Sequence, residues 1–93
     1  MSYELEFIEV ALAEWQKLDG SIREQFKKKL QERLEMPRVP AAKLSDHPDR
    51  YKIKLRAIGY RLVYQVEEER LVVLVVAVGR RERNAVYQAA AKR

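Results

Sequence analysis

The stretch Tyr51-Lys-Ile-Lys-Leu-Arg-Ala-Ile-Gly-Tyr-Arg-Leu-Val-Tyr-Gln-Val66 alternates apolar side chains with basic or polar ones, and the alternation breaks once, at Gly59. Successive side chains of a strand point to opposite faces, so this pattern predicts two strands, over about residues 51–56 and 60–66. The two strands would form a hairpin with the glycine in its turn.

The two faces of this hairpin differ in charge. One face carries the apolar residues Tyr51, Ile53, Leu55, Tyr60, Leu62, Tyr64 and Val66. The other carries Lys52, Lys54 and Arg56, and Arg61 joins them if the apolar sides of both strands face a common core. No acidic residue lies between residues 51 and 66, whereas solubilising surfaces usually mix both signs. A fixed row of cations on one face has the form of a phosphate-binding surface.

Length and charge limit the class of protein. A chain of 93 residues with 47% apolar residues suffices for one domain, residues 1–93, with one core. Residues 1–49 hold 8 Lys/Arg and 10 Asp/Glu, and residues 50–93 hold 11 and 4, so the halves carry −2 and +7. A positive half favours a polyanionic partner, of which nucleic acid is the commonest.

The remaining pattern predicts an α+β fold with the order βααβββα, in which an N-terminal helical hairpin covers one face of an antiparallel sheet. A strand over about residues 2–8 precedes a short helix that starts at Glu9 and stops at Asp19-Gly20. Ser21-Ile-Arg-Glu24 is a capping box that opens a second helix, and Pro37 ends it.

The C-terminal part is expected to contain a central strand and a helix. Leu71 to Val78 is apolar on both faces, which suits a strand covered on both sides, and Gly79 is expected to terminate it. Asn84 is a candidate N-cap for a final helix over Ala85 to Lys92.

Several classes of site are disfavoured by the composition. The chain has no cysteine and one histidine, His47, so a zinc site is not expected. A triad of Ser45, Asp46 and His47 is disfavoured because sequence neighbours rarely reach the required geometry. The N-terminus lacks the pattern of a signal peptide, and the longest apolar run is too short to cross a bilayer. We therefore expect a cytoplasmic protein without metal, cofactor or membrane partner.

The basic residues belong to motifs spread along nearly the whole chain. These motifs are Tyr51-Lys-Ile-Lys-Leu-Arg, Gly59-Tyr-Arg-Leu-Val-Tyr-Gln-Val66, Val78-Gly-Arg-Arg-Glu-Arg83, Val86-Tyr87, Glu14-Trp15, Arg23-Glu-Gln and Lys27-Lys-Lys-Leu30. In them the chain resembles the RelE toxins of bacterial toxin-antitoxin pairs. One departure is Ser45, which stands where family members have an arginine, so we expect an auxiliary contact with mRNA or the ribosome to be lost and leave Ser45 out of the site.

The resemblance implies a compact microbial-ribonuclease-like fold and metal-independent cleavage of mRNA in the ribosomal A site. It implies as partners a RelB-like antitoxin, mRNA, and the ribosome with its 16S rRNA. By matching position, the implied active-site residues are Lys52, Lys54, Arg61, Arg81 and Tyr87. Further contacts with RNA are expected from Arg56, Arg80 and Arg83.

Cleavage by attack of a 2′-OH on the adjacent phosphorus needs a base, stabilisation of the phosphorane charge and an acid. Either Lys52 or Lys54 is the expected base, because neighbouring cations lower the pKa of a lysine. Arg61 and Arg81 would stabilise the transition state, Arg81 is also a candidate acid, and Tyr87 would stack on a base. Alternatives are a ParE-like inhibitor of DNA gyrase, an inert RNA- or antitoxin-binding module, or cations that only solubilise a sheet face. The catalytic hypothesis requires cations from three separate segments to converge.

Overall fold

The computed structural model describes residues 2–82 and 84–93. The elements follow the expected order βααβββα: β1 (Glu4–Phe7), α1 (Glu9–Gln16), α2 (Gly20–Glu35), β2 (Arg50–Leu55), β3 (Tyr60–Glu67), β4 (Val72–Arg80) and α3 (Ala85–Ala91). Two 3₁₀ turns, η1 (Pro40–Ala42) and η2 (Glu68–Arg70), lie in the connections before β2 and before β4. The predicted α+β class is confirmed.

The sheet has the strand order β1-β4-β3-β2. β2, β3 and β4 pair in antiparallel fashion as expected, but β1 runs parallel to β4, so the sheet is mixed. β4 lies between β1 and β3, which explains why its residues are apolar on both faces. The prediction of a central strand at this position is confirmed.

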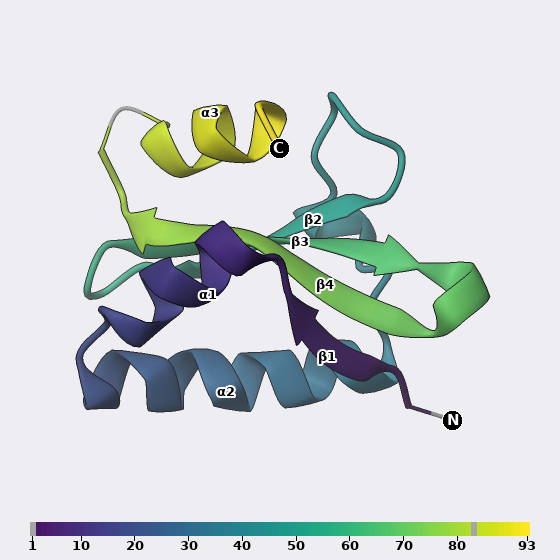
Figure 1. The fold of residues 1–93 in the computed structure, drawn as a ribbon, viewed down its shortest axis with the longest axis horizontal. Coiled ribbons are helices and arrows are strands. Elements are labelled where there is room, and N and C mark those ends of the chain that lie inside the picture. Colours follow the sequence, from purple (N-terminus) through teal and green to yellow (C-terminus); the bar gives the residue numbers. More distant parts are fainter. Residues whose placement is uncertain (1, 83) are drawn as a thin grey trace.

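The sheet is covered on both sides (Figure 1). α1 and α2 pack on one face, which we call the hairpin face, where Trp15, Phe26 and Leu30 join Ile53 and Tyr64 in the larger core cluster. α3 covers part of the opposite face, which we call the α3 face, where Val86 and Ala90 pack on Val63, Val76 and Ala77. Each face of the central strands therefore has its own apolar contact.

Two boundary predictions are wrong. β4 continues through Gly79 to Arg80, where a strand end was expected. α2 begins at Gly20 with Asp19 as N-cap, so Ser21 and Glu24 do not form a capping box. The Ser21 hydroxyl instead donates a hydrogen bond of 2.8 Å to the Asp19 carboxylate. The helix starts one residue earlier because extended Asp19, not Ser21, marks the turn into it.

No helix within residues 2–82 and 84–93 is long and apolar enough to cross a membrane.

Candidate nucleic-acid interface and active site

The β2–β3 hairpin places the predicted cations on the α3 face. Lys54 lies opposite Arg61, which in turn lies opposite Gly79 of β4, and Lys52 lies opposite Val63. Residues directly opposite each other on neighbouring strands share a face. Since Val63 belongs to the core cluster under α3, Lys52, Lys54 and Arg61 share the face that this helix partly covers.

The side chains meet at a shallow pocket beside the β2–β3 turn, which we call the cationic hollow. Its lining contains four cations and no acid: Lys54, Arg56, Arg61 and Arg81, with Leu55, Gly59 and Tyr60. Gly59 has φ +70°, a left-handed conformation that glycine adopts without strain, and this shapes the turn. The Arg81 backbone N–H donates to the Gly59 carbonyl at 2.7 Å, which fixes the segment after β4 beside the turn.

A second hollow continues from the first along the outer edge of β2. Lys54 and Arg56 line it together with Lys52, next to Arg33 and residues of the η1 segment. The structure thus brings together five cations from β2, the turn after it, β3 and the segment after β4: Lys52, Lys54, Arg56, Arg61 and Arg81. This surface offers several cations to one polyanionic chain.

Mutual repulsion lowers the pKa of Lys54 from its ordinary value. The largest contribution is the positive charge of Lys52, followed by desolvation and by the charges of Arg61, Arg56 and Arg81. Each nearby cation disfavours the protonated ammonium. The lowered pKa suits Lys54 to the role of a base.

Tyr87 and Asn84 hold the Arg61 guanidinium. Its central carbon lies 5.0 Å from the centroid of the Tyr87 ring, a cation–π contact. One of its nitrogens, Nη1, donates to Asn84 Oδ1 at 3.4 Å. Tyr87 Oη is buried without a hydrogen-bond partner within the described part of the chain. Burial raises the pKa of this phenol, although Arg61 and Arg56 act against that change.

One of the expected RNA contacts is not brought to this surface. Arg80 lies opposite Tyr60 in the sheet register, one residue out of phase with Gly79, and therefore points to the hairpin face. There its Nε donates to Tyr60 Oη at 3.2 Å, and its guanidinium carbon lies 5.8 Å from the Tyr60 ring centroid. Arg83 lies outside the described residues.

Asn84 is a site residue that the sequence did not reveal. It occupies the N-cap position of α3 as predicted, but it makes no side-chain cap, has φ +63° and uses its oxygen to orient Arg61. Asparagine is among the few residues that tolerate left-handed backbone, so an asparagine directly after the arginine-rich segment was the available signal.

The only histidine has a structural contact. His47 Nδ1 accepts a hydrogen bond of 3.0 Å from the Asp49 backbone N–H within its own loop. Among the described residues, no three His, Cys, Asp or Glu side chains are grouped closely enough to hold a metal ion.

A small α+β domain with an acid-free cationic hollow over one sheet face places the protein in the class of basic α+β domains. Comparison with known proteins identifies the family within that class. The model of the ParE toxin of type II toxin-antitoxin systems (parDE) matches residues 5–85. The mRNA interferase toxin RelE of Escherichia coli K12 is 60% identical over 93 residues, which is all of this chain and 98% of that protein. The chain belongs to the RelE/ParE superfamily of type II toxins.

Solved structures of relatives have the same fold over nearly all of the chain. A mutant of E. coli toxin RelE in the free state superposes with a TM-score of 0.91 at 58% identity, covering 99% of this chain and 97% of that one. RelE in the intact E. coli RelBE toxin-antitoxin complex superposes with a TM-score of 0.84 at 60% identity, covering 88% and 100%. The predicted resemblance to RelE toxins is confirmed.

Proposed function

We propose that this protein is an mRNA interferase, a metal-independent endoribonuclease that cleaves mRNA in the ribosomal A site and needs no cofactor. The observation that carries the proposal is the convergence of Lys54, Arg61 and Arg81 in one acid-free hollow, with Lys52 beside it. The scissile phosphate and its two bridging oxygens would lie in this hollow. The identity with RelE, named an mRNA interferase toxin, supports the same assignment.

Lys54 is the proposed general base. The 2′-OH must lose its proton as it attacks the adjacent phosphorus, and a base works best when its pKa lies near the working pH. Lys52 lowers the pKa of Lys54 in this direction. Lys52 itself would bind the phosphate and would not transfer the proton.

Arg61 and Arg81 are proposed to stabilise the transition state. As the phosphorane forms, negative charge grows on the nonbridging oxygens, and guanidinium groups donate paired hydrogen bonds to such oxygens. Asn84 and Tyr87 already orient Arg61, so little reorganisation is needed during the reaction. Arg81 is also proposed to protonate the leaving 5′ oxygen, although a guanidinium holds its proton tightly and is a weak acid.

Tyr87 is proposed to support a base of the mRNA next to the cleaved bond. Stacking of a base on an aromatic ring contributes roughly 1–3 kcal/mol. Because the acid is weak, the isolated protein should be slow, and the ribosome would supply catalysis by positioning the mRNA. Orientation alone can contribute ~7–11 kcal/mol to lowering a barrier.

The proposal also names partners and a location. Messenger RNA and the ribosome with its 16S rRNA are the targets, and a RelB-like antitoxin is the inhibitor, as suggested by the RelBE complex of the relative. An acidic or amphipathic segment of that antitoxin would cover the cationic hollow and exclude mRNA. The protein would act in the cytoplasm, where ribosomes translate.

The test is single-turnover cleavage of mRNA bound to ribosomes by Arg81→Ala, Tyr87→Ala and Arg61→Lys variants. Each should be impaired, and Arg61→Lys should show that an ammonium cannot replace the bidentate guanidinium. Lys28→Ala is the matched control, because Lys28 is exposed on α2, on the hairpin side of the sheet. Wild-type rates in both the Arg81 and Tyr87 variants would refute the assignment.

A second candidate function is inhibition of DNA gyrase, because the matching family model is named for the ParE toxin. The two functions predict different damage after expression of the protein. An mRNA interferase yields messages cut within codons, whereas gyrase poisoning yields double-strand DNA breaks. DNA breaks without mRNA fragments would favour the second function, and neither lesion would favour an inert binding module.

A further inference from the structure

Arg50 is a buried charge outside the proposed catalytic set. The residue is 9% exposed, and it is the one charged residue buried within the described chain. It begins β2 and lies opposite Gln65 of β3, on the α3 face, two residues before Lys52. Burying a charge is costly unless it is paired and hydrogen-bonded, so its partners indicate what it stabilises.

The partners of Arg50 connect the sheet to the last turn of α3. Its Nε donates to Gln65 Oε1 at 3.0 Å, and its Nη1 donates to the backbone carbonyl of Ala90. Within the described residues no carboxylate forms an ion pair with it. The carbonyls at a helix C-terminus carry partial negative charge, which favours a guanidinium beside them. The Ala90 carbonyl also accepts from the Arg93 backbone N–H at 3.0 Å, so Arg50 binds it as a second donor.

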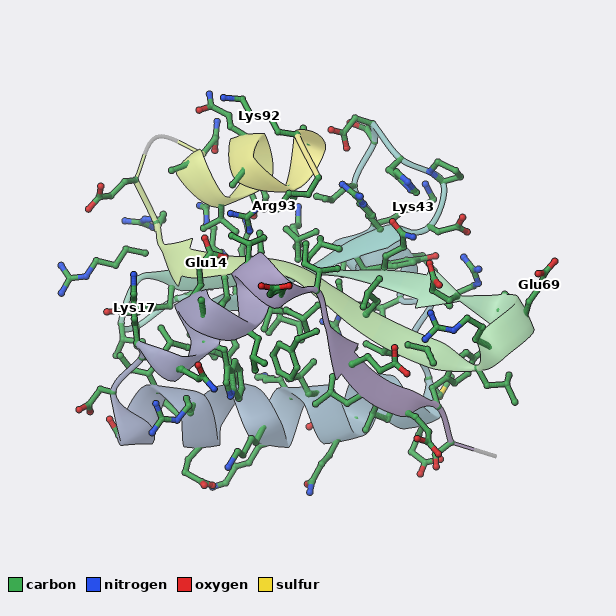
Figure 2. The ribbon with its side chains drawn as sticks, viewed as in Figure 1. Glu14, Lys17, Lys43, Glu69, Lys92 and Arg93 are labelled. Atoms are coloured by element: carbon green, nitrogen blue, oxygen red, sulfur yellow. The ribbon has the colours of Figure 1, made fainter. Side chains whose placement is uncertain are left out.

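The helix that Arg50 contacts depends on such anchors. α3 has seven residues, four of them alanine, and buries only Val86 and Ala90. An isolated helix of this length is unstable in water, so its contacts with the sheet fix its position. A second contact joins the end of α3 to α1 and β4. Arg93 pairs with Glu14 of α1 at 2.8 Å and donates to the Val76 carbonyl of β4 at 2.8 Å. Figure 2 shows Glu14 and Arg93 between α1 and α3.

The position of α3 determines the position of Tyr87. Tyr87 lies three residues before Ala90, about one helical turn, and its ring contacts the Arg61 guanidinium. Arg50 therefore links the strand that carries Lys52 and Lys54 to the helix that carries Tyr87. A shift of the last turn of α3 would move the ring relative to the cationic hollow.

We infer that Arg50 is a positioning residue, whose guanidinium holds the last turn of α3 so that Tyr87 stays in register with Arg61 and Lys54. This inference rests on the proposed function for its effect on cleavage, but the anchoring of α3 is independent of it. Arg50 does not touch the RNA. It acts through Tyr87, and this dependence separates a positioning role from a contribution to stability alone.

The kinetic test is a double-mutant cycle. Arg50→Met keeps the aliphatic volume and removes the donors, and its single-turnover rate at saturating ribosome-bound mRNA should fall roughly 10-fold or more, because small misplacements are costly. In a Tyr87→Ala background the same substitution should change the rate less than about twofold, because residues that act as a unit are not additive. Equal losses in both backgrounds, or no loss, would overturn the inference.

Arg70→Met is the matched control for lost arginine contacts. Arg70 pairs with Glu6 and Glu67 outside the α3 contact, so this variant should affect thermal stability without any coupling to Tyr87. If Arg50→Met does not fold, Arg50→Lys replaces it. The lysine keeps the charge but makes fewer of the hydrogen bonds, so it should give a smaller rate loss that also disappears in the Tyr87→Ala background.

Hydrogen exchange tests the anchor without requiring activity. Amides of α3 should exchange faster in Arg50→Met than in the wild type, while amides of β3 and β4 should be unchanged, and Arg70→Met should leave α3 protected. Unchanged exchange in α3 would overturn the anchoring role. If the wild type fails to cleave mRNA, the proposed function falls, and the exchange result alone decides whether Arg50 holds the helix.

Discussion

At the residue scale, the electrostatic relation between two lysines can be tested directly. The charge of Lys52 is the largest cause of the lowered pKa of Lys54. Lys52→Gln removes that charge, which stabilises protonated Lys54 and raises its pKa. We expect the rising limb of the pH–rate profile to move to higher pH, so that cleavage near neutral pH slows.

The measurement is the single-turnover cleavage rate at saturating ribosome-bound mRNA across the pH range in which ribosomes stay intact. Lys52→Gln also loses a phosphate contact, which weakens binding. At saturating mRNA this weaker binding does not affect the rate, so the measured shift reports the pKa of Lys54. Lys28→Gln, on the outer side of α2, should leave the profile in place. A limb that stays fixed or moves to lower pH in Lys52→Gln would show that Lys54 is not the base.

Asn84 allows its backbone and side-chain roles to be separated. Its φ of +63° suits glycine, and its Oδ1 accepts from Arg61. Asn84→Gly should retain stability within about 0.5 kcal/mol and slow cleavage several-fold, because Arg61 loses an orienting contact. Asn84→Ala should slow cleavage equally. It should also lower the free energy of unfolding by a further ~1 kcal/mol relative to Asn84→Gly, because a residue with a Cβ is strained in the left-handed conformation. Urea unfolding and single-turnover kinetics measure the two effects, and wild-type cleavage by Asn84→Gly would contradict the orienting role.

At the element scale, Tyr64 joins α2 and the following segment to the sheet. Its buried Oη donates to the Pro37 carbonyl at 2.6 Å and accepts from Arg33 Nη1 at 2.8 Å. In Tyr64→Phe the Pro37 carbonyl loses this donor, while Arg33 Nη1 still donates to the Lys52 carbonyl at 3.2 Å. The free energy of unfolding should fall by about 1–3 kcal/mol. Because Tyr64 lies on the hairpin face, the cleavage rate of the folded variant should be unchanged.

Urea unfolding of Tyr64→Phe beside Tyr60→Phe measures this contribution. The Tyr60 hydroxyl accepts a hydrogen bond from the exposed Arg80, so its removal should change stability by less than about 0.5 kcal/mol. Equal stability changes in the two variants would mean that the buried contacts of Tyr64 do not secure α2.

The strands of the hairpin could be predicted because apolar and polar residues alternate along them, so the sequence shows which residues share a face. β2 and β3 formed where alternation placed them, and Lys54 and Arg61 share a face as their spacing required. For β4 the sequence does not show which residues face which side of the sheet, since its residues are apolar on both faces. The sheet register also shifts between Val63 and Tyr64, which changes the phase along β4. The sequence therefore did not indicate that Gly79 faces the site and Arg80 faces away.

Gly79 shows why a glycine was mistaken for a strand end. A Cβ at this position would lie 3.6 Å from the Val86 side chain, an ordinary contact distance, so Gly79 is a regular β4 residue beneath the start of α3. The local order of apolar and polar residues does not show how α3 packs on β4. The location of Arg81 was equally hidden, because it depends on a hydrogen bond to Gly59 across the sheet.

At the scale of the whole molecule, the acids are distributed so that the cationic hollow keeps its charge. Arg38, Arg70 and Arg93 form ion pairs with acids from other segments of the chain. Within the described residues, no ion pair includes the cations of the hollow. Five cations of the C-terminal half, Lys52, Lys54, Arg56, Arg61 and Arg81, are therefore gathered without acids where a phosphate chain would bind.

One of those pairs should make stability depend on pH. Glu14 Oε1 accepts from Arg93 Nη1 at 2.8 Å and from the Val78 backbone N–H at 3.2 Å, and Oε2 accepts from Arg93 Nη2 at 3.0 Å. Burial raises the pKa of Glu14, but the hydrogen bonds from Arg93 and Val78 outweigh it, so the pKa lies below its usual value. The unfolded chain then binds the proton more readily than the folded chain does.

The stabilisation from ionised Glu14 is therefore complete above the unfolded pKa of about 4.3 and is lost as the pH falls through the lower folded pKa. Glu14→Gln keeps the shape and removes the charge. Because the pair is partly exposed and screened, the variant should be less stable by about 1 kcal/mol at neutral pH. That difference should shrink below about pH 4. Urea unfolding of both proteins from neutral pH downward measures it, and a difference that stays constant as the pH falls would show that the Glu14 charge does not stabilise the fold.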